Sequence, residues 1–183
     1  MSATPTMAVL CATLRAGRGF AHKRDIGDVL GQLARSLPGG ADALAQAVGI
    51  GDDCAAIPFK DADGDGYLLF AIEGFIEDFV QAQPWFAGWS GLMVNLSDIA
   101  AMGGRPIAVV DALWSHGETP GAQVLQGLAA ASQRYGVPIV GGHSNSRAER
   151  GGLAVAVLGR ARRLLTSFAA LPGDTLVTTG GAV

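Results

Sequence analysis

The segment PWFAGWSGLMVNLSDIAAMGGRP, residues 84–106, decides the fold that we predict for this chain. Its large apolar side chains recur at intervals of three and four residues, which predicts a helix with one buried face. These side chains are Trp85, Trp89, Leu92, Leu96 and Ile99. Two glycines, Gly103 and Gly104, then end the helix, and the apolar segment 106–113 predicts a strand. A helix followed directly by a buried strand indicates an α/β domain.

The flanking segments extend this pattern in both directions. Further helices are predicted at 26–37, 41–48 and 121–135, and further strands at 137–140 and 152–159. The stretch KDADGDGYLLFAIEGF, residues 60–75, passes from a turn rich in Asp and Gly into an apolar run. This change predicts a hairpin-like turn that leads into a buried strand ending at Glu73.

Length and composition favour one soluble domain with a large core. A chain of 183 residues is long enough for one such domain and the start of a second. A net charge of -3 with 13 basic residues offers no cationic surface for nucleic acid. The one basic cluster, Arg160, Arg162 and Arg163, follows a predicted strand, and we expect it on a solvated edge without a role.

The cysteines and the N-terminal segment bear on the compartment. Cys11 and Cys54 form no CxxC pair, which argues against a disulfide framework or a zinc site and favours a reducing cytoplasm. The apolar stretch MAVLCATL, residues 7–14, is much shorter than the roughly 18 residues that predict a membrane span. We therefore expect a cytoplasmic protein that does not bind membranes.

Several acidic residues could share a magnesium ion. Asp52 and Asp53 are adjacent, and two neighbouring carboxylates repel each other unless a positive charge is close. Glu73 and Asp78 flank the turn after the apolar strand, and Asp98 lies near the end of the helix in 84–106. Each acid taken alone has a structural explanation, such as a turn cap at Asp52. Together they predict a site where Mg²⁺ carries phosphate groups.

Three more polar residues are candidates for contacts with a ligand. Asn95 lies three residues before Asp98 and so on the same helix face. The segment VGGHSNS places His143 after a predicted strand, where paired glycines permit close approach of a ligand. The Gly-rich basic stretch GRGFAHKRD, residues 17–25, could fold over a phosphate, with Lys23 or Arg24 making the contact. A hydrogen-bonded bystander histidine and an exposed loop are equally open alternatives.

Three motifs give the chain a family resemblance. GDDCAAI resembles the acidic loop of the aminoimidazole ribonucleotide (AIR) synthase-related, or PurM-like, superfamily. NLSDIAAMGGRP is similar to the signature helix and turn of its thiamine-monophosphate kinases and selenophosphate synthetases, and VGGHS resembles a GG-plus-polar motif. The resemblance covers the chain from about residue 20.

The resemblance implies a fold and a domain plan. It implies a PurM N-terminal-like α/β (α+β) domain with a mixed sheet packed with helices, which forms a homodimer through its sheet and binds ATP near the interface. That domain would occupy residues 1–160, and 161–183 would be a linker and the first strand of a C-terminal domain, because PGDTLVTTG resembles that strand.

The resemblance also implies roles for individual residues. Asp52, Asp53, Asp98 and, less closely, Glu73 would hold Mg²⁺. Asn95, His143 and Asp78 would contact the nucleotide or its metals. Lys23 would stand at the position of the selenium enzyme's essential lysine. His22 replaces the reactive Cys or selenocysteine before that lysine, and GGHS replaces GGDT, so the resemblance favours neither selenophosphate synthesis nor thiamine phosphate as substrate.

These observations predict an ATP- and Mg²⁺-dependent phosphotransferase or ligase domain that activates a small-molecule substrate. The alternative is a nucleotide-binding or dimerisation module without turnover. A metal-independent structural domain is the third interpretation, and it predicts no stabilisation by Mg-ATP.

Overall fold

The structure is a computed structural model that describes residues 5–36, 51–175 and 177. The chain divides into two compact units, Met1–Gly51 and Asp52–Val183. The predicted helix at 41–48 lies outside the described residues, as does most of the predicted strand near the C-terminus. The predicted domain boundary at residue 160 stays a prediction.

The first unit contains two helices, α1 (Met7–Ala16) and α2 (Arg18–Ser36). Thr6 caps α1, since its hydroxyl accepts a hydrogen bond from the Val9 N–H at 3.4 Å. Helix α2 begins at Arg18 rather than at Ile26, so the prediction of a loop over residues 17–25 is wrong. The interspersed Arg, Lys and Ala residues are good helix formers and extend the helix backwards. No helix in the described residues is long and apolar enough to cross a membrane.

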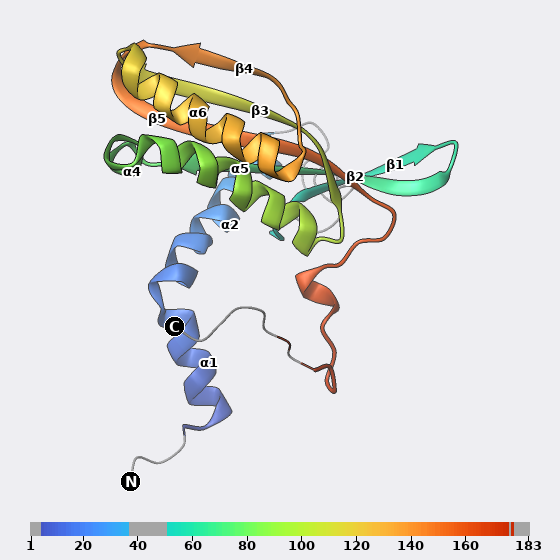
Figure 1. The fold of residues 1–183 in the computed structure, drawn as a ribbon. Helices are drawn as coiled ribbons and strands as arrows, with labels where there is room; N and C mark the ends of the chain where they lie inside the picture. Colours follow the sequence, from blue (N-terminus) through green and yellow to red (C-terminus); the bar gives the residue numbers. More distant parts are fainter. Residues whose placement is uncertain (1–4, 37–50, 176, 178–183) are drawn as a thin grey trace. The chain divides into compact units, whose positions relative to one another are not determined.

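The second unit is a five-stranded mixed sheet with helices on one face (Figure 1). Its elements in chain order are β1 (Ala55–Asp61), β2 (Gly64–Phe75), α4 (Glu77–Ala82), α5 (Pro84–Ala101), β3 (Arg105–His116), α6 (Glu118–Tyr135), β4 (Ile139–Asn145), β5 (Arg147–Ala161) and the short 3-10 helix η1 (Ser167–Ala169). The strand order is β1-β2-β5-β3-β4, in which only β3 and β4 are parallel. The predicted α/β class and mixed sheet are confirmed.

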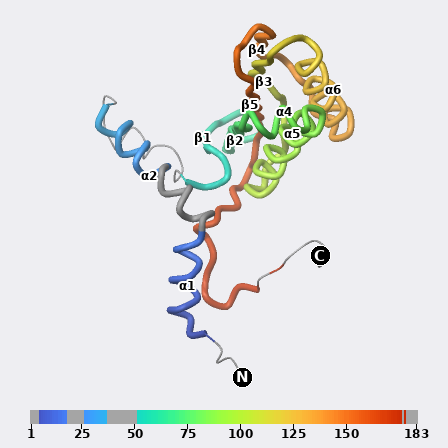
Figure 2. Tube along the Cα trace, turned by 90° about the vertical axis from the view of Figure 1, so that its left-hand side faces the viewer, coloured from blue at the N-terminus to red at the C-terminus, as the bar shows by residue number. Residues whose placement is uncertain are grey.

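Strand alternation divides the sheet into a covered and an open face. Leu69 and Ala71 in β2 and Val155 and Val157 in β5 are at most 1% exposed, and they share the face on which α5 lies. The side chains between them belong to the other face, where Ile72 is 64% exposed. Figure 2 shows α5 and α6 together on one side of these strands.

Two glycines let α5 and α6 approach very closely. A Cβ at Gly88 would collide with the Val124 carbonyl, and a Cβ at Gly127 with the Trp85 carbonyl. Because the helix backbones nearly touch there, no large side chain fits between them. Trp85 is therefore displaced to the surface, 44% exposed and stacked on Trp89, although its spacing predicted a buried position.

Other sequence-based boundaries also need correction. Strand β2 continues past Glu73 to Phe75, and β4 begins at Ile139 and includes the GGHSN segment, so His143 lies inside a strand and not after one. Strand β5 is the middle strand of the sheet, so Arg160 near its end is not at a sheet edge as expected. A short apolar run shows that a strand exists, but long-range pairing sets its length.

Candidate acidic site and similarity to known proteins

Asp52 precedes β1 and ties this loop to the segment after β5. Its Oδ1 accepts hydrogen bonds from the Ser167 hydroxyl at 2.5 Å and the Asp53 N–H at 3.1 Å, and its Oδ2 accepts one from the Ser167 N–H at 3.0 Å. Burial alone would raise the pKa of the Asp52 carboxyl, but these hydrogen bonds outweigh it and lower the pKa. The carboxylate is held in a fixed position.

Three of the predicted acids surround one buried thiol. Cys54 is 6% exposed, and its N–H donates to Met102 Sδ at 3.0 Å in the turn after α5. Burial and, after it, the negative charges of Asp98, Asp53 and Asp52 raise the pKa of the thiol to about 12. Cys54 is therefore protonated at neutral pH in the absence of a metal ion. The Met102 contact and the charge effect together place Asp98, near the end of α5, close to the loop that carries Asp52 and Asp53.

These acids do not form a preassembled metal cage. In the described residues, no group of three or more His, Cys, Asp or Glu side chains is arranged to hold a metal ion. Magnesium needs only one or two carboxylates when phosphate oxygens and water complete its shell. Asp53 is exposed and Asp98 is half-buried, so the residues fit a metal that arrives with a phosphate ligand.

Glu73 and Asn95 both lie beside Val155. Glu73 is opposite Val155 in the β2–β5 register and is exposed. Strand β1 begins at Ala55, opposite Phe70 of the antiparallel strand β2, so the acidic loop that precedes Ala55 lies toward the Glu73 end of β2. Asn95 is fully buried, and its Nδ2 donates to the carbonyls of Gly91 at 2.7 Å and Val155 at 3.0 Å. The amide thus fixes α5 on β5, and its contact with a nucleotide stays a prediction.

The structure separates His143 from the acids that precede β1. His143 is exposed on β4, the edge strand opposite to β1, and three strands lie between these edges. Adjacent strands are about 4.8 Å apart, so His143 lies on the order of 19 Å across the sheet from the Asp52 loop. Asp78 is exposed in the first turn of α4. Lys23 lies in α2 of the first unit, and its side chain is outside the described residues.

A carboxyl group that the sequence analysis missed lies under the helices. Asp111 interrupts the apolar run of β3, and its position opposite Val155 places it on the covered face. Its Oδ2 is buried without a hydrogen-bond partner in the described part of the chain, and burial raises the pKa of the carboxyl. A Cβ on Gly142 would collide with this carboxyl, so the second glycine of the GG pair makes room for Asp111. One acid within an apolar strand was the available signal.

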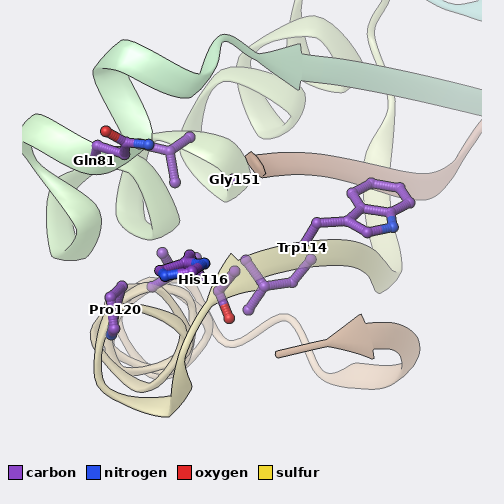
Figure 3. A pocket seen from close by; sticks show the side chains of 9 residues that line it. Gln81, Trp114, His116, Pro120 and Gly151 are labelled. Atoms are coloured by element: carbon purple, nitrogen blue, oxygen red, sulfur yellow. The ribbon is translucent and has the colours of Figure 1, made fainter. Parts of the chain in front are cut away.

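A separate cavity of about 320 Å³ opens at the other end of β3 (Figure 3). Its floor is apolar and buried, and includes Val80, Leu113 and Val124. Gln81 from α4 and Trp114 and His116 from β3 lie around it. The Gln81 amide donates to Glu77 Oε1 at 2.9 Å, and the same oxygen accepts the Gly151 N–H at 3.0 Å. This neutral, largely apolar cavity differs in chemistry from the acidic site.

Fold and site together define a class: a mixed α/β domain with a cluster of carboxylates at one sheet edge, next to the turn after α5. The chain belongs to the family described as "AIR synthase related protein, N-terminal domain", whose model matches residues 51–161. The predicted family is thereby confirmed. The matched segment begins at the acidic loop and ends with β5.

Individual relatives support this membership. The chain is 50% identical over 159 residues to an uncharacterised Synechocystis protein, sll0787, covering 87% of this chain and 47% of the relative. It is 34% identical over 143 residues to the thiamine-monophosphate kinase of Pyrococcus horikoshii, covering 72% of this chain and 43% of the kinase. The solved structure "AaThiL complexed with AMPPCP and TMP" matches with a TM-score of 0.55 at 26% identity, over 69% of this chain and 43% of the other. The chain thus spans about half the length of these relatives.

Proposed function

We propose that this chain is the nucleotide-binding part of an ATP-dependent kinase or synthetase that phosphorylates a small molecule. The observation that carries the proposal is that the Cys54 N–H contacts Met102 Sδ, which brings the loop with Asp52 and Asp53 to the end of the helix that carries Asp98. Such a concentration of negative charge is stable when a cation neutralises it. Relatives support the choice of ligand, since one is a thiamine-monophosphate kinase and another was solved with AMPPCP.

The chain's own residues would divide the work of binding. Asp53 and Asp98 would hold magnesium, which supplies positive charge to the phosphate groups of ATP. Asp52 would position the loop, because its oxygens already accept three hydrogen bonds from Ser167 and Asp53. Glu73 would be an additional acid at the margin of the site. This arrangement binds and orients phosphate groups and requires little side-chain chemistry.

Calorimetric titration of ATP tests the acidic site. With Mg²⁺ present, we expect Asp53→Asn to weaken ATP binding by at least about tenfold, because a metal-binding charge is lost. Asp65→Asn is the matched control, since Asp65 is exposed in the β1–β2 hairpin and pairs only with Lys60 at the surface. Equal affinity in the wild type and Asp53→Asn, with and without Mg²⁺, would reject the proposal.

We also propose a homodimer that forms through the open face of the sheet. Many of its large apolar side chains are exposed in the single chain: Ile57, Phe70, Ile72, Ile107, Val110 and Trp114. An exposed patch of this kind marks an interaction surface. His143 pairs with Ala112, which alternation places on this same face. A second copy could therefore bring His143 toward an acidic loop that it cannot reach within one chain.

A module that binds nucleotide without turnover is the second candidate. The observation that favours it is the segment GGHS, residues 141–144, which resembles the GGDT motif of the kinases but has His143 in place of the aspartate. This candidate predicts binding of Mg-ATP with no release of ADP. An ADP-release assay on this chain, and on a version extended past Val183 by the remaining length of its relatives, separates the two.

A further inference from the structure

A second cavity, of about 420 Å³, is lined by four arginine and two aromatic residues. These residues are Arg105, Arg160, Arg162, Arg163, Phe59 and Tyr67. No acidic side chain lines the cavity among the described residues. The chain has 13 basic residues and a net charge of -3, so four cations around one cavity are an uneven distribution of charge that needs an explanation.

Two of these arginines oppose each other across the sheet. Arg105 in β3 pairs directly with Arg160 in β5. Like charges in directly opposite positions destabilise a sheet. Within the described ranges, the close ion pairs belong to Lys60 and Arg162. The Asp61 carboxylate that Arg162 holds also interacts with the charge of Arg160, so the repulsion between Arg105 and Arg160 is offset only in part. A bound anion would remove this cost.

Arg162 is different because the β1–β2 hairpin holds it in place. Its Nη2 donates to both carboxylate oxygens of Asp61, at 2.8 and 2.9 Å, and its Nη1 to the Gly64 carbonyl at 3.0 Å. Arg162 is the main cause that lowers the pKa of Asp61, and the charge of Arg160 contributes to the same effect. One wall of the cavity is therefore fixed, and the other three guanidinium groups keep their hydrogen-bonding capacity.

We propose that this arginine cavity binds the phosphate group of an organic phosphate whose aromatic part lies against Phe59. Strand alternation puts Phe59, which is opposite Gly66, on the same open face of the sheet as Arg105 and Arg160. Guanidinium groups present paired N–H donors that match phosphate oxygens. The Phe59 ring offers an apolar surface to the rest of the molecule. The cavity also includes Gly103, the residue after Met102, whose sulfur accepts the Cys54 N–H. Arginine needs no metal to bind phosphate, and the proposal does not rest on the function proposed above.

The test measures binding of phenyl phosphate by calorimetry in EDTA, with inorganic phosphate as the comparison ligand. We expect phenyl phosphate to bind more tightly than inorganic phosphate. We expect Arg105→Gln and Arg160→Gln each to weaken its binding by about tenfold, because each loses charge-assisted hydrogen bonds. Arg134→Gln is the matched control, since Arg134 is in the last turn of α6 and does not line the cavity. Asp53→Asn should bind phenyl phosphate as the wild type does.

Melting temperatures provide a second measurement, which also tests the unliganded protein. Without ligand, Arg160→Gln should melt at the wild-type temperature or above it, because the repulsion from Arg105 is removed. With saturating phenyl phosphate, the wild type should gain more than the variant. The proposal is overturned if the wild type does not bind phenyl phosphate, if Arg105→Gln and Arg160→Gln bind it as tightly as the wild type, or if phenyl phosphate and inorganic phosphate bind equally.

Discussion

The covered and the open face of the sheet carry similar apolar side chains, but they differ in what those side chains contact. On the covered face, Leu69 is completely buried under the helices, whereas Ile72 in the same strand is 64% exposed on the open face. The covered side also holds two buried polar side chains, Asp111 and Asn95. Each has one oxygen without a hydrogen-bond partner in the described residues. Residue type therefore does not distinguish the faces, and the position of α5 and α6 does.

The largest expected effect is the loss of a covered side chain. Leu69→Ala should lower the free energy of unfolding by about 2–5 kcal/mol, since it leaves a cavity beneath the helices. Ile72→Ala, the matched change on the open face, should alter it by no more than about 0.5 kcal/mol in dilute protein. Urea unfolding of the two variants measures both values. Similar losses would show that the open face is not solvent-exposed in the isolated chain.

A smaller loss of stability is expected where the two helices meet. Gly88→Ala should cost about 1–3 kcal/mol, because its Cβ would collide with the Val124 carbonyl and force α5 and α6 apart. Gly27→Ala, in helix α2, has open space around its Cβ and should be neutral or stabilise that helix by up to about 1 kcal/mol. Thermal unfolding followed by circular dichroism compares them. A neutral Gly88→Ala would refute the close helix contact.

Substitutions on the open face should change the oligomeric state with little change of fold. A charge at Ile72 or Ile57, as in Ile72→Asp or Ile57→Asp, should dissociate the proposed homodimer because both side chains are exposed on the open face of the single chain. Sedimentation velocity should show a dimer for the wild type and a monomer for each variant, with unchanged circular dichroism. A wild-type monomer at all concentrations would remove the proposed interface.

The smallest expected effect concerns the buried acid on the covered face. Because burial raises the pKa of Asp111, the folded state keeps its proton at a pH where the unfolded chain has lost it. The contribution of Asp111 to stability should therefore fall as pH rises from the unfolded pKa near 3.8 through the raised folded pKa. Asp111→Asn should lack this contribution, which urea titrations at several pH values can detect. An identical pH dependence in both proteins would contradict the assignment.

Sequence patterns predicted most of the second unit. The repeat of three and four residues in 84–106 predicted α5, which spans Pro84–Ala101. The predicted segments 106–113, 121–135 and 152–159 lie within β3, α6 and β5 of the structure. Amphipathic periodicity is local, so it can be recognised without knowledge of the neighbours. Trp85 was misplaced because its exposure depends on Gly127 of another helix.

The candidate site was predictable in part. Motifs identified Asp52, Asp53 and Asp98 as candidates, and the negative charges of all three act on Cys54, but their role as metal ligands stays a prediction. Nothing in the sequence indicated that Ser167 would bind Asp52, because this contact joins segments more than a hundred residues apart. Asp111 was overlooked since a single acid in an apolar strand carries no spacing pattern.

The sequence by itself determined the periodic helices and strands, the acidic loop and the family, because these depend on residue types at short spacing. Only the tertiary structure decided that β1 and β4 lie at opposite edges, which separates His143 from the acids. It also decided that Arg105 and Arg160 oppose each other in a cavity that Phe59 helps to line. Strand order and register come from burial of the whole sheet under α5 and α6, and no single segment encodes them.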